Sequence, residues 1–152
     1  MTRHLWLRQL DSLERVAFDS NSLIYLLERR QPYLDLVEPV LQRMNQGQTL
    51  AWISVVVEME LLVGPMRDGD SSKLNELEVF LEQTPNLSLR AVDRAIAHRA
   101  AQLRAGTRLA PLDSLIAATA LEEQCDAIIG NDLTMASRLT EIPYLYLNEY
   151  II

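Results

Sequence analysis

Short apolar runs alternate along the chain with longer segments of helical periodicity. Residues 15–18 form the first run, which ends at Asp19 and is typical of a short buried strand. Further strands are expected at 49–53, 87–89, 127–129 and 144–147. These runs are continuously apolar rather than half polar, which indicates strands that are covered on both faces of a parallel sheet.

Helical periodicity fills the intervals between these runs. Helices are expected at 21–30, 32–44, 54–64, 74–81, 91–104, 111–124 and 133–139. Ser54 is a suitable N-cap, and Gly64–Pro65 is expected to end the helix that Ser54 begins. Strands and helices therefore alternate, which predicts the α/β class. We expect a three-layer α/β/α fold around a short, mostly parallel sheet of four to five strands.

Two aspartates stand at strand ends, where such a sheet binds ligands, and a third lies at a helix start. Ligands of parallel sheets lie at the carboxyl ends of the strands, near the reversal in strand order. Asp19 ends the first strand, Asp132 follows the fourth, and Asp113 lies near the start of an alanine-rich helix. Each aspartate also has an ordinary alternative role as a helix cap or a turn residue.

A glutamate in the segment ISVVVEMELLVG is a further candidate. Glu60 has no charged neighbour three or four residues away, so it must be paired from elsewhere, protonated or bound to a metal. Glu58 lies in nearly equally apolar surroundings, and periodicity alone does not choose between the two. Magnesium and manganese ions prefer carboxylate oxygens, so a shared acidic pocket would suit either ion.

Composition limits the class of protein. The 152 residues suggest one domain, and no apolar run reaches the roughly 18 residues that a membrane helix needs. Cys125 is the only cysteine, which fits a reducing cytoplasm. The net charge of −7 argues against a nucleic-acid partner unless the acids gather around cations. Lys73 is the only lysine, so the other residues with a permanent positive charge are arginines. The planar guanidinium of arginine suits bidentate contacts with phosphate.

The segments that carry these acids resemble the PIN-domain ribonuclease family, in particular its VapC-like toxin branch. The matching segments are FDSNSLIYLLE, ISVVVEMELLVG, LDSLIAATAL and AIIGNDL. The resemblance selects Glu60 over Glu58. It runs from about Arg15 to Leu147, which implies a nuclease domain at 15–152 and an N-terminal extension at 1–14.

The resemblance implies a metal-dependent endoribonuclease that hydrolyses RNA phosphodiester bonds. Asp19, Glu60, Asp113 and Asp132 would hold Mg²⁺ or Mn²⁺ and act as the catalytic residues. Asn21 and Asn131 would support them by orienting carboxylates or water. A toxin role, a small antitoxin partner and a homodimer are expected on the same ground.

The sequence departs from the family pattern at three places. Gly130 stands where a threonine or serine is common, Met135 stands where an aromatic residue often follows, and the extension is longer than usual. Apolar residues could dock the extension onto the domain or onto a partner; they are Leu5, Trp6, Leu10 and Leu13.

Three alternatives remain open at this stage. The first is a catalytically silent scaffold that binds RNA or protein, and the second is a DNA or flap nuclease with similar carboxylates. The third is a phospho-receiver domain. It normally has an acidic pair after the first strand and a late lysine, whereas this chain offers only Asp19 and the mid-chain Lys73.

Overall fold

Five short strands form one parallel sheet in the computed structural model, which describes residues 2–151. The strands are β1 (Arg15–Phe18), β2 (Leu50–Ser54), β3 (Leu87–Arg90), β4 (Ala127–Gly130) and β5 (Tyr144–Tyr146). The helices are α1 (Thr2–Asp11), α2 (Ser20–Leu27), α3 (Leu34–Asn45), α4 (Val55–Asp68), α5 (Ser71–Gln83), α6 (Arg94–Gly106), α7 (Pro111–Glu122), α8 (Leu133–Arg138) and the 3-10 helix η1 (Leu147–Tyr150).

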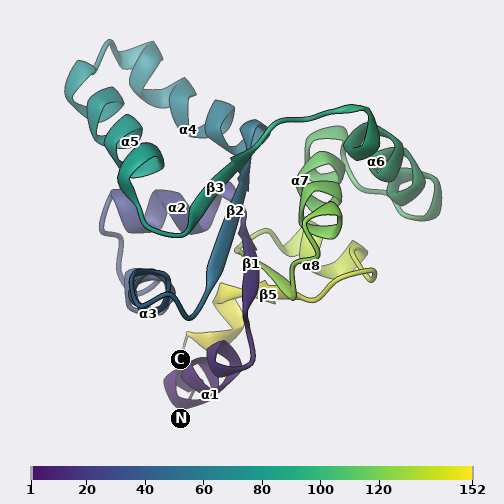
Figure 1. The fold of residues 1–152 in the computed structure, drawn as a ribbon, viewed down its shortest axis with the longest axis horizontal. Coiled ribbons are helices and arrows are strands. Elements are labelled where there is room, and N and C mark those ends of the chain that lie inside the picture. The colour runs from purple at the N-terminus through teal and green to yellow at the C-terminus, as the bar shows by residue number, and fades with distance from the viewer. Residues whose placement is uncertain (1, 152) are drawn as a thin grey trace.

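The strand order is β3-β2-β1-β4-β5, and every pairing is parallel. Helices α2 and α3 lie on one side of the sheet, and α6 and α7 lie on the other (Figure 1). The predicted three-layer α/β/α fold is therefore confirmed, and the sheet is wholly parallel. The chain moves one way from β1 to β3 and returns to the other side of β1 with β4. The reversal in strand order thus lies between β1 and β4.

The sheet interior is built from the apolar runs that the sequence shows. Val16, Ile128 and Ile129 are buried in the two central strands. Helix α7 contributes Ala117 and Ala118, which are fully buried. Because these side chains are small, the backbone of α7 can lie close to the sheet, and residues in its first turn are held near the strand ends.

The N-terminal extension forms helix α1, which packs on α3 and η1. The Trp6 side chain is fully buried, and its indole Nε1 donates a hydrogen bond to the Leu36 carbonyl at 2.7 Å. Its ring also meets Tyr150 edge to face, with the centroids 4.8 Å apart. Leu10 and Leu13 are buried as well, whereas Leu5 is exposed. Docking onto the domain is thus the observed role of this apolar set, except at Leu5.

The helix boundaries differ from the sequence prediction at several places. Helix α4 does not end at Gly64–Pro65 but continues to Asp68, with the left-handed Gly69 as its cap. Val57 and Leu61 are buried on this helix, and their packing outweighs the one backbone hydrogen bond that Pro65 removes.

Two other helices begin later than predicted. Helix α3 begins two residues after Pro32, and α6 begins at Arg94 because Asp93 caps it through the Ile96 amide. Across residues 2–151, none of the helices has both the length and the apolar character that a membrane crossing requires.

Candidate active site

Asp19 lies at the carboxyl end of β1, next to the reversal in strand order. Its backbone amide donates to the Ile129 carbonyl at 2.9 Å, which ties it to β4. Its Oδ1 accepts from the Ser20 amide at 2.7 Å, so it also caps α2. The Ser22 hydroxyl lies 2.7 Å from the Asp19 carbonyl and 3.0 Å from that of Ile129. These contacts hold a carboxylate that is only 5% exposed.

Asp132 and Asp113 approach the same point from β4 and α7. Asp132 follows β4 by two residues and caps α8 through the Met135 amide at 3.0 Å. Asp113 lies in the first turn of α7, where Ala110 is the N-cap and Pro111 the first residue. Asp113 is therefore not the N-cap of α7, and helix capping, the alternative role considered for it from the sequence, does not explain its position.

Glu60 and Glu58 lie on α4 but border different hollows. Glu60 lines a hollow of about 690 Å³ between α2, α4 and α5. Glu58 lines a separate hollow of about 330 Å³ together with Leu81 and Leu89. Among the four acids of the candidate site, Glu60 alone is exposed, and it stands at the rim.

The four acids lie close enough together to affect one another electrostatically. Burial raises the pKa of Asp19 most, and Asp132 raises it further, against the hydrogen bonds that lower it. Burial also raises the pKa of Asp113 to about 6, with Asp132 and Asp19 adding to the rise. The pKa of Glu60 is raised by burial first and then by Asp19, Asp113 and Asp132. Burial is the larger cause of each raised pKa, and repulsion between the negative charges of these acids adds to it.

This donor set fits a hydrated divalent cation. Within residues 2–151, no three acid, histidine or cysteine side chains converge closely enough to coordinate an ion as a closed set. Mg²⁺ usually keeps several waters and takes only one or two carboxylates directly. A few carboxylate oxygens around a common space therefore suit such an ion, because water molecules can complete its coordination.

The two asparagines differ in what their positions allow. Asn21 is half-buried in the first turn of α2, two residues after Asp19. Asn131 donates through Nδ2 to the Tyr25 hydroxyl at 3.0 Å and accepts through Oδ1 from the Asn148 amide at 2.9 Å. Its amide thus joins the end of β4 to α2 and η1. Asn131 can therefore orient Asp132 only by fixing the turn that carries it, since its own side-chain amide is already hydrogen-bonded.

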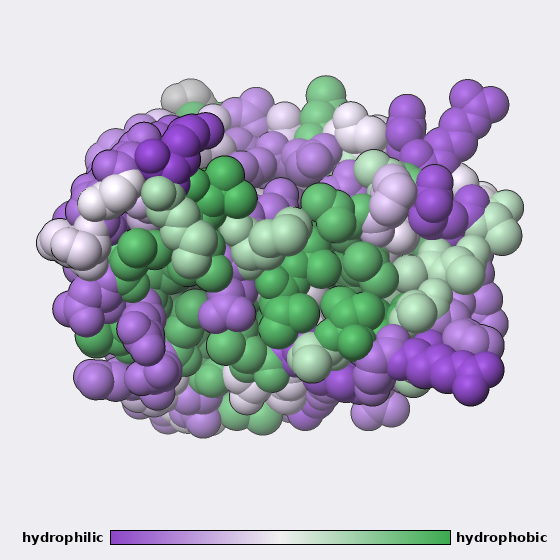
Figure 2. All heavy atoms as spheres, turned by 90° about the horizontal axis from the view of Figure 1, so that it is seen from above, coloured by the Kyte–Doolittle hydropathy of each residue, from purple (hydrophilic) through white to green (hydrophobic). Residues whose placement is uncertain are grey.

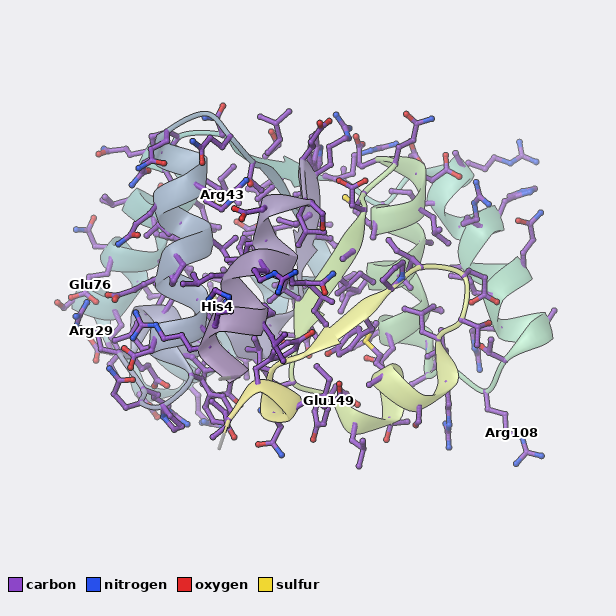
Figure 3. The ribbon with its side chains drawn as sticks, turned by 90° about the horizontal axis from the view of Figure 1, so that it is seen from below. His4, Arg29, Arg43, Glu76, Arg108 and Glu149 are labelled. Atoms are coloured by element: carbon purple, nitrogen blue, oxygen red, sulfur yellow. The ribbon has the colours of Figure 1, made fainter. Side chains whose placement is uncertain are left out.

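Basic residues lie around the site, whereas the histidines do not. Arg30, Arg67 and Lys73 line the hollow that Glu60 borders. His4 is exposed on α1, and His98 is exposed on α6 (Figure 3 labels His4). Neither histidine is among the groups that shift the pKa of Asp19, Glu60 or Asp113. The arrangement points to chemistry carried by carboxylates rather than by imidazole.

Sequence reasoning missed Tyr144, whose hydroxyl lies among the acids. It donates to Asp19 Oδ2 at 2.8 Å and accepts from the Asp132 backbone amide at 3.0 Å. Burial and the neighbouring Asp19 raise the pKa of Tyr144, so the hydroxyl keeps its proton. The one signal in the sequence was indirect, namely the lack of a side chain at Gly130.

Fold and site together define a class: a doubly wound parallel α/β domain with acidic side chains at its topological switch. Residues 16–138 match the model of the PIN domain family. The chain therefore belongs to the PIN domain family, as the sequence motifs predict. Proteins of this family are typically nucleases and are generally metal-dependent.

Solved structures of toxin–antitoxin complexes share this fold. One neighbour is VapBC2 from Rickettsia felis bound to a DNA fragment from its promoter. It has 17% identity and a TM-score of 0.69, over 87% of this chain and 98% of that one. DNA-bound VapBC from Salmonella typhimurium has 23% identity and a TM-score of 0.64, over 88% and 98%. A toxin–antitoxin complex from Klebsiella pneumoniae has 22% identity and a TM-score of 0.62, over 87% and 97%. No curated protein sequence gives a significant match.

Proposed function

We propose that this chain is a metal-dependent endoribonuclease, with Asp19, Glu60, Asp113 and Asp132 as its catalytic acids. The observation that carries the proposal is the shared field of these four side chains. They come from four separate segments, and three of them have raised pKa values caused in part by the others. Evenly scattered surface acids would not affect one another in this way.

The four acids would hold Mg²⁺ or Mn²⁺, with Asp19 and Asp113 as the main direct ligands. Glu60 and Asp132 would contribute directly or through water. A divalent ion bound there supplies Lewis-acid chemistry for phosphodiester hydrolysis. Because binding favours the charged carboxylates, the protons retained on the acids must leave as the ion enters.

The chain would hold its RNA along the hollow beside Glu60. Arg30, Arg67 and Lys73 offer positive charge there, which suits the phosphates of a nucleic-acid backbone. Glu28 and Asp68 line the same hollow and form exposed ion pairs with Arg30 and Arg67, so these arginines would exchange a carboxylate for a phosphate when RNA binds. In the overall reaction, water adds to phosphorus and one P–O bond of the backbone breaks.

The test is cleavage of structured RNA by the purified protein in Mn²⁺ or Mg²⁺. Asp19→Asn and Asp113→Asn should each lower the rate by about 100-fold or more, because metal catalysis supplies several kcal/mol and each 1.4 kcal/mol is tenfold in rate. Glu60→Gln should also lower the rate, whereas Glu58→Gln serves as the matched control on the same helix. EDTA should abolish cleavage by the wild type.

An inert but folded wild type that binds no Mn²⁺ in calorimetry at millimolar concentration would overturn the proposal in favour of a silent scaffold. A parallel arm uses single-stranded DNA of the same sequence. Faster cleavage of that DNA would make the protein a DNA nuclease instead.

We also propose that the protein is the toxin of a toxin–antitoxin pair, with a small antitoxin partner, a homodimeric state and a cytoplasmic location. The support is the fold shared with the toxin–antitoxin complexes described above. Expression in a bacterial host should arrest growth, and Asp19→Asn should abolish the arrest. Co-expression of a small protein encoded next to this gene should relieve it. Growth unaffected by an active enzyme would refute the toxin role.

A further inference from the structure

The hydroxyl of Tyr144 bridges the ends of β1 and β4 at the candidate site. Tyr144 begins β5 and lies opposite Ile128 of β4 in the parallel register. Its side chain reaches past β4 so that its oxygen contacts Asp19 Oδ2 and the Asp132 backbone amide. One hydroxyl group therefore touches an acid that follows β1 and the turn that carries an acid after β4.

Gly130 makes room for this contact. A Cβ atom built on Gly130 would collide with the Tyr144 hydroxyl and would lie 2.6 Å from Asp19 Cβ. Cβ contacts below 3.0 Å are essentially never seen, so a larger residue would displace the hydroxyl, Asp19 or both. The absence of a side chain at position 130 is therefore what allows the Tyr144 hydroxyl to contact Asp19.

The direction of the hydrogen bonds gives this hydroxyl a defined effect on Asp19. It accepts from the Asp132 amide, so its single proton is directed at Asp19 Oδ2. The Ser20 amide already donates to Oδ1. The Ser20 hydroxyl lies a further 3.4 Å from Oδ1. Both oxygens of Asp19 are therefore oriented, and Oδ2 keeps a free lone pair, because each oxygen of an ionised carboxylate has about two acceptor positions.

We propose that Tyr144 is a positioning residue: its hydroxyl occupies the space that Gly130 leaves open and sets the orientation of Asp19 for a divalent cation. The hydroxyl lies where the side chain of any larger residue at position 130 would begin. The inference rests on the proposed metal site, because it assigns to Asp19 a role as metal ligand.

The test compares Mn²⁺ binding to the full-length wild type, Tyr144→Phe and Tyr146→Phe by calorimetry. Tyr144→Phe removes only the hydroxyl and should weaken Mn²⁺ binding by about 10- to 100-fold, as losses of such supporting contacts typically do. Tyr146→Phe is the matched control. It removes the same group from the same strand, and within residues 2–151 the Tyr146 hydroxyl makes no hydrogen bond. It should bind Mn²⁺ like the wild type.

A second measurement separates positioning from general damage. Excess Mn²⁺ should restore kcat of Tyr144→Phe with KM for RNA unchanged. Because bound Mn²⁺ also stabilises the fold, circular dichroism in EDTA should show that the variant is fully folded before metal is added, which a loosened fold would not be. If Tyr144→Phe fails to fold, Gly130→Ala disturbs the same contact from the other side and should show the same weakened binding and recovery.

The outcomes distinguish this inference from the proposed function. Unchanged Mn²⁺ affinity in a folded Tyr144→Phe variant, with loss of binding in Asp19→Asn, overturns the role of Tyr144 and leaves the nuclease proposal standing. If the wild type itself binds no Mn²⁺, both proposals fall together. Equal weakening in Tyr146→Phe would also overturn the inference, because the effect would not depend on the contact with Asp19.

Discussion

At the residue scale, Asp113 links the site to the pH dependence of stability. Its pKa is raised from 3.8 to about 6, chiefly by burial and then by Asp132 and Asp19. The folded protein therefore holds this proton more tightly than the unfolded chain does. In the metal-free protein, the contribution of Asp113 to stability is most favourable below pH 4 and is lost as the pH rises through about 6.

Asp113→Asn should remove this penalty. In EDTA the variant should match the wild type near pH 4 and exceed it at pH 7.5. We expect a gain of about 1 kcal/mol, since solvent screening reduces the effect at this half-buried group. Urea unfolding at the two pH values measures it. The exposed Asp68→Asn variant provides the control, and equal gains at both pH values would contradict the argument.

At the element scale, α1 is an integral support of α3 even though it precedes the region that matches the family. Trp6→Ala should destabilise the protein by about 3–5 kcal/mol, because it empties a fully buried site and leaves the Leu36 carbonyl without its indole donor. Leu5→Ala changes a residue of the same helix that is 55% exposed, and its effect should stay within about 0.5 kcal/mol. Chemical denaturation followed by circular dichroism compares the two. Similar effects would show that α1 does not rely on Trp6.

Local pattern was sufficient to predict most elements, because buried strands and amphipathic helices repeat with different periods. It failed where tertiary packing decides the outcome. Gly64–Pro65 has the sequence of a helix end, yet α4 continues to Asp68. In the extension, the sequence suggested docking through its apolar residues but did not predict helix α1, because Arg3, Arg8 and Asp11 interrupt the apolar pattern.

The sequence likewise predicted the candidate site only in part. Asp19 and Asp132 could be placed because a parallel sheet gathers its strand ends at one edge. Asp113, which lies in the first turn of α7, was placed with them only by the motif. Local periodicity left Glu60 and Glu58 open, and only the motif separated them. Tyr144 could not be found, because its contact depends on the register of β5 against β4. No local pattern in the sequence encodes that register.

At the scale of the whole molecule, an apolar stripe on α4 bears on the proposed homodimer. Met59, Val63 and Met66 are spaced along one helical face and are 46%, 52% and 60% exposed. Figure 2 shows hydrophobic side chains gathered across the middle of the face seen from above, the side along which α4 runs in Figure 1. By contrast, Leu34 and Val37 of α3 are buried in the core.

Val63→Asp should weaken self-association by about 100-fold or more, because an unpaired carboxylate would be buried at the contact. Sedimentation velocity over a range of concentrations measures the change. Leu133→Asp places the same charge on an exposed residue of α8 and should leave association unaltered. A wild type that sediments as a monomer at every concentration would contradict the homodimer.

The mutual repulsion of the four acids also predicts that metal binding stabilises the whole fold. A ligand at 100 times its dissociation constant stabilises the folded state by about 2.7 kcal/mol. For a domain of this length, each kcal/mol raises Tm by about 2–4 °C, so saturating Mn²⁺ should raise Tm by roughly 5–10 °C. NaCl at equal ionic strength should have a smaller effect, since it screens the acids without bridging them. Asp19→Asn should lose most of the Mn²⁺ shift in differential scanning calorimetry. A shift that survives in this variant would mean that Mn²⁺ stabilises the protein at some other place.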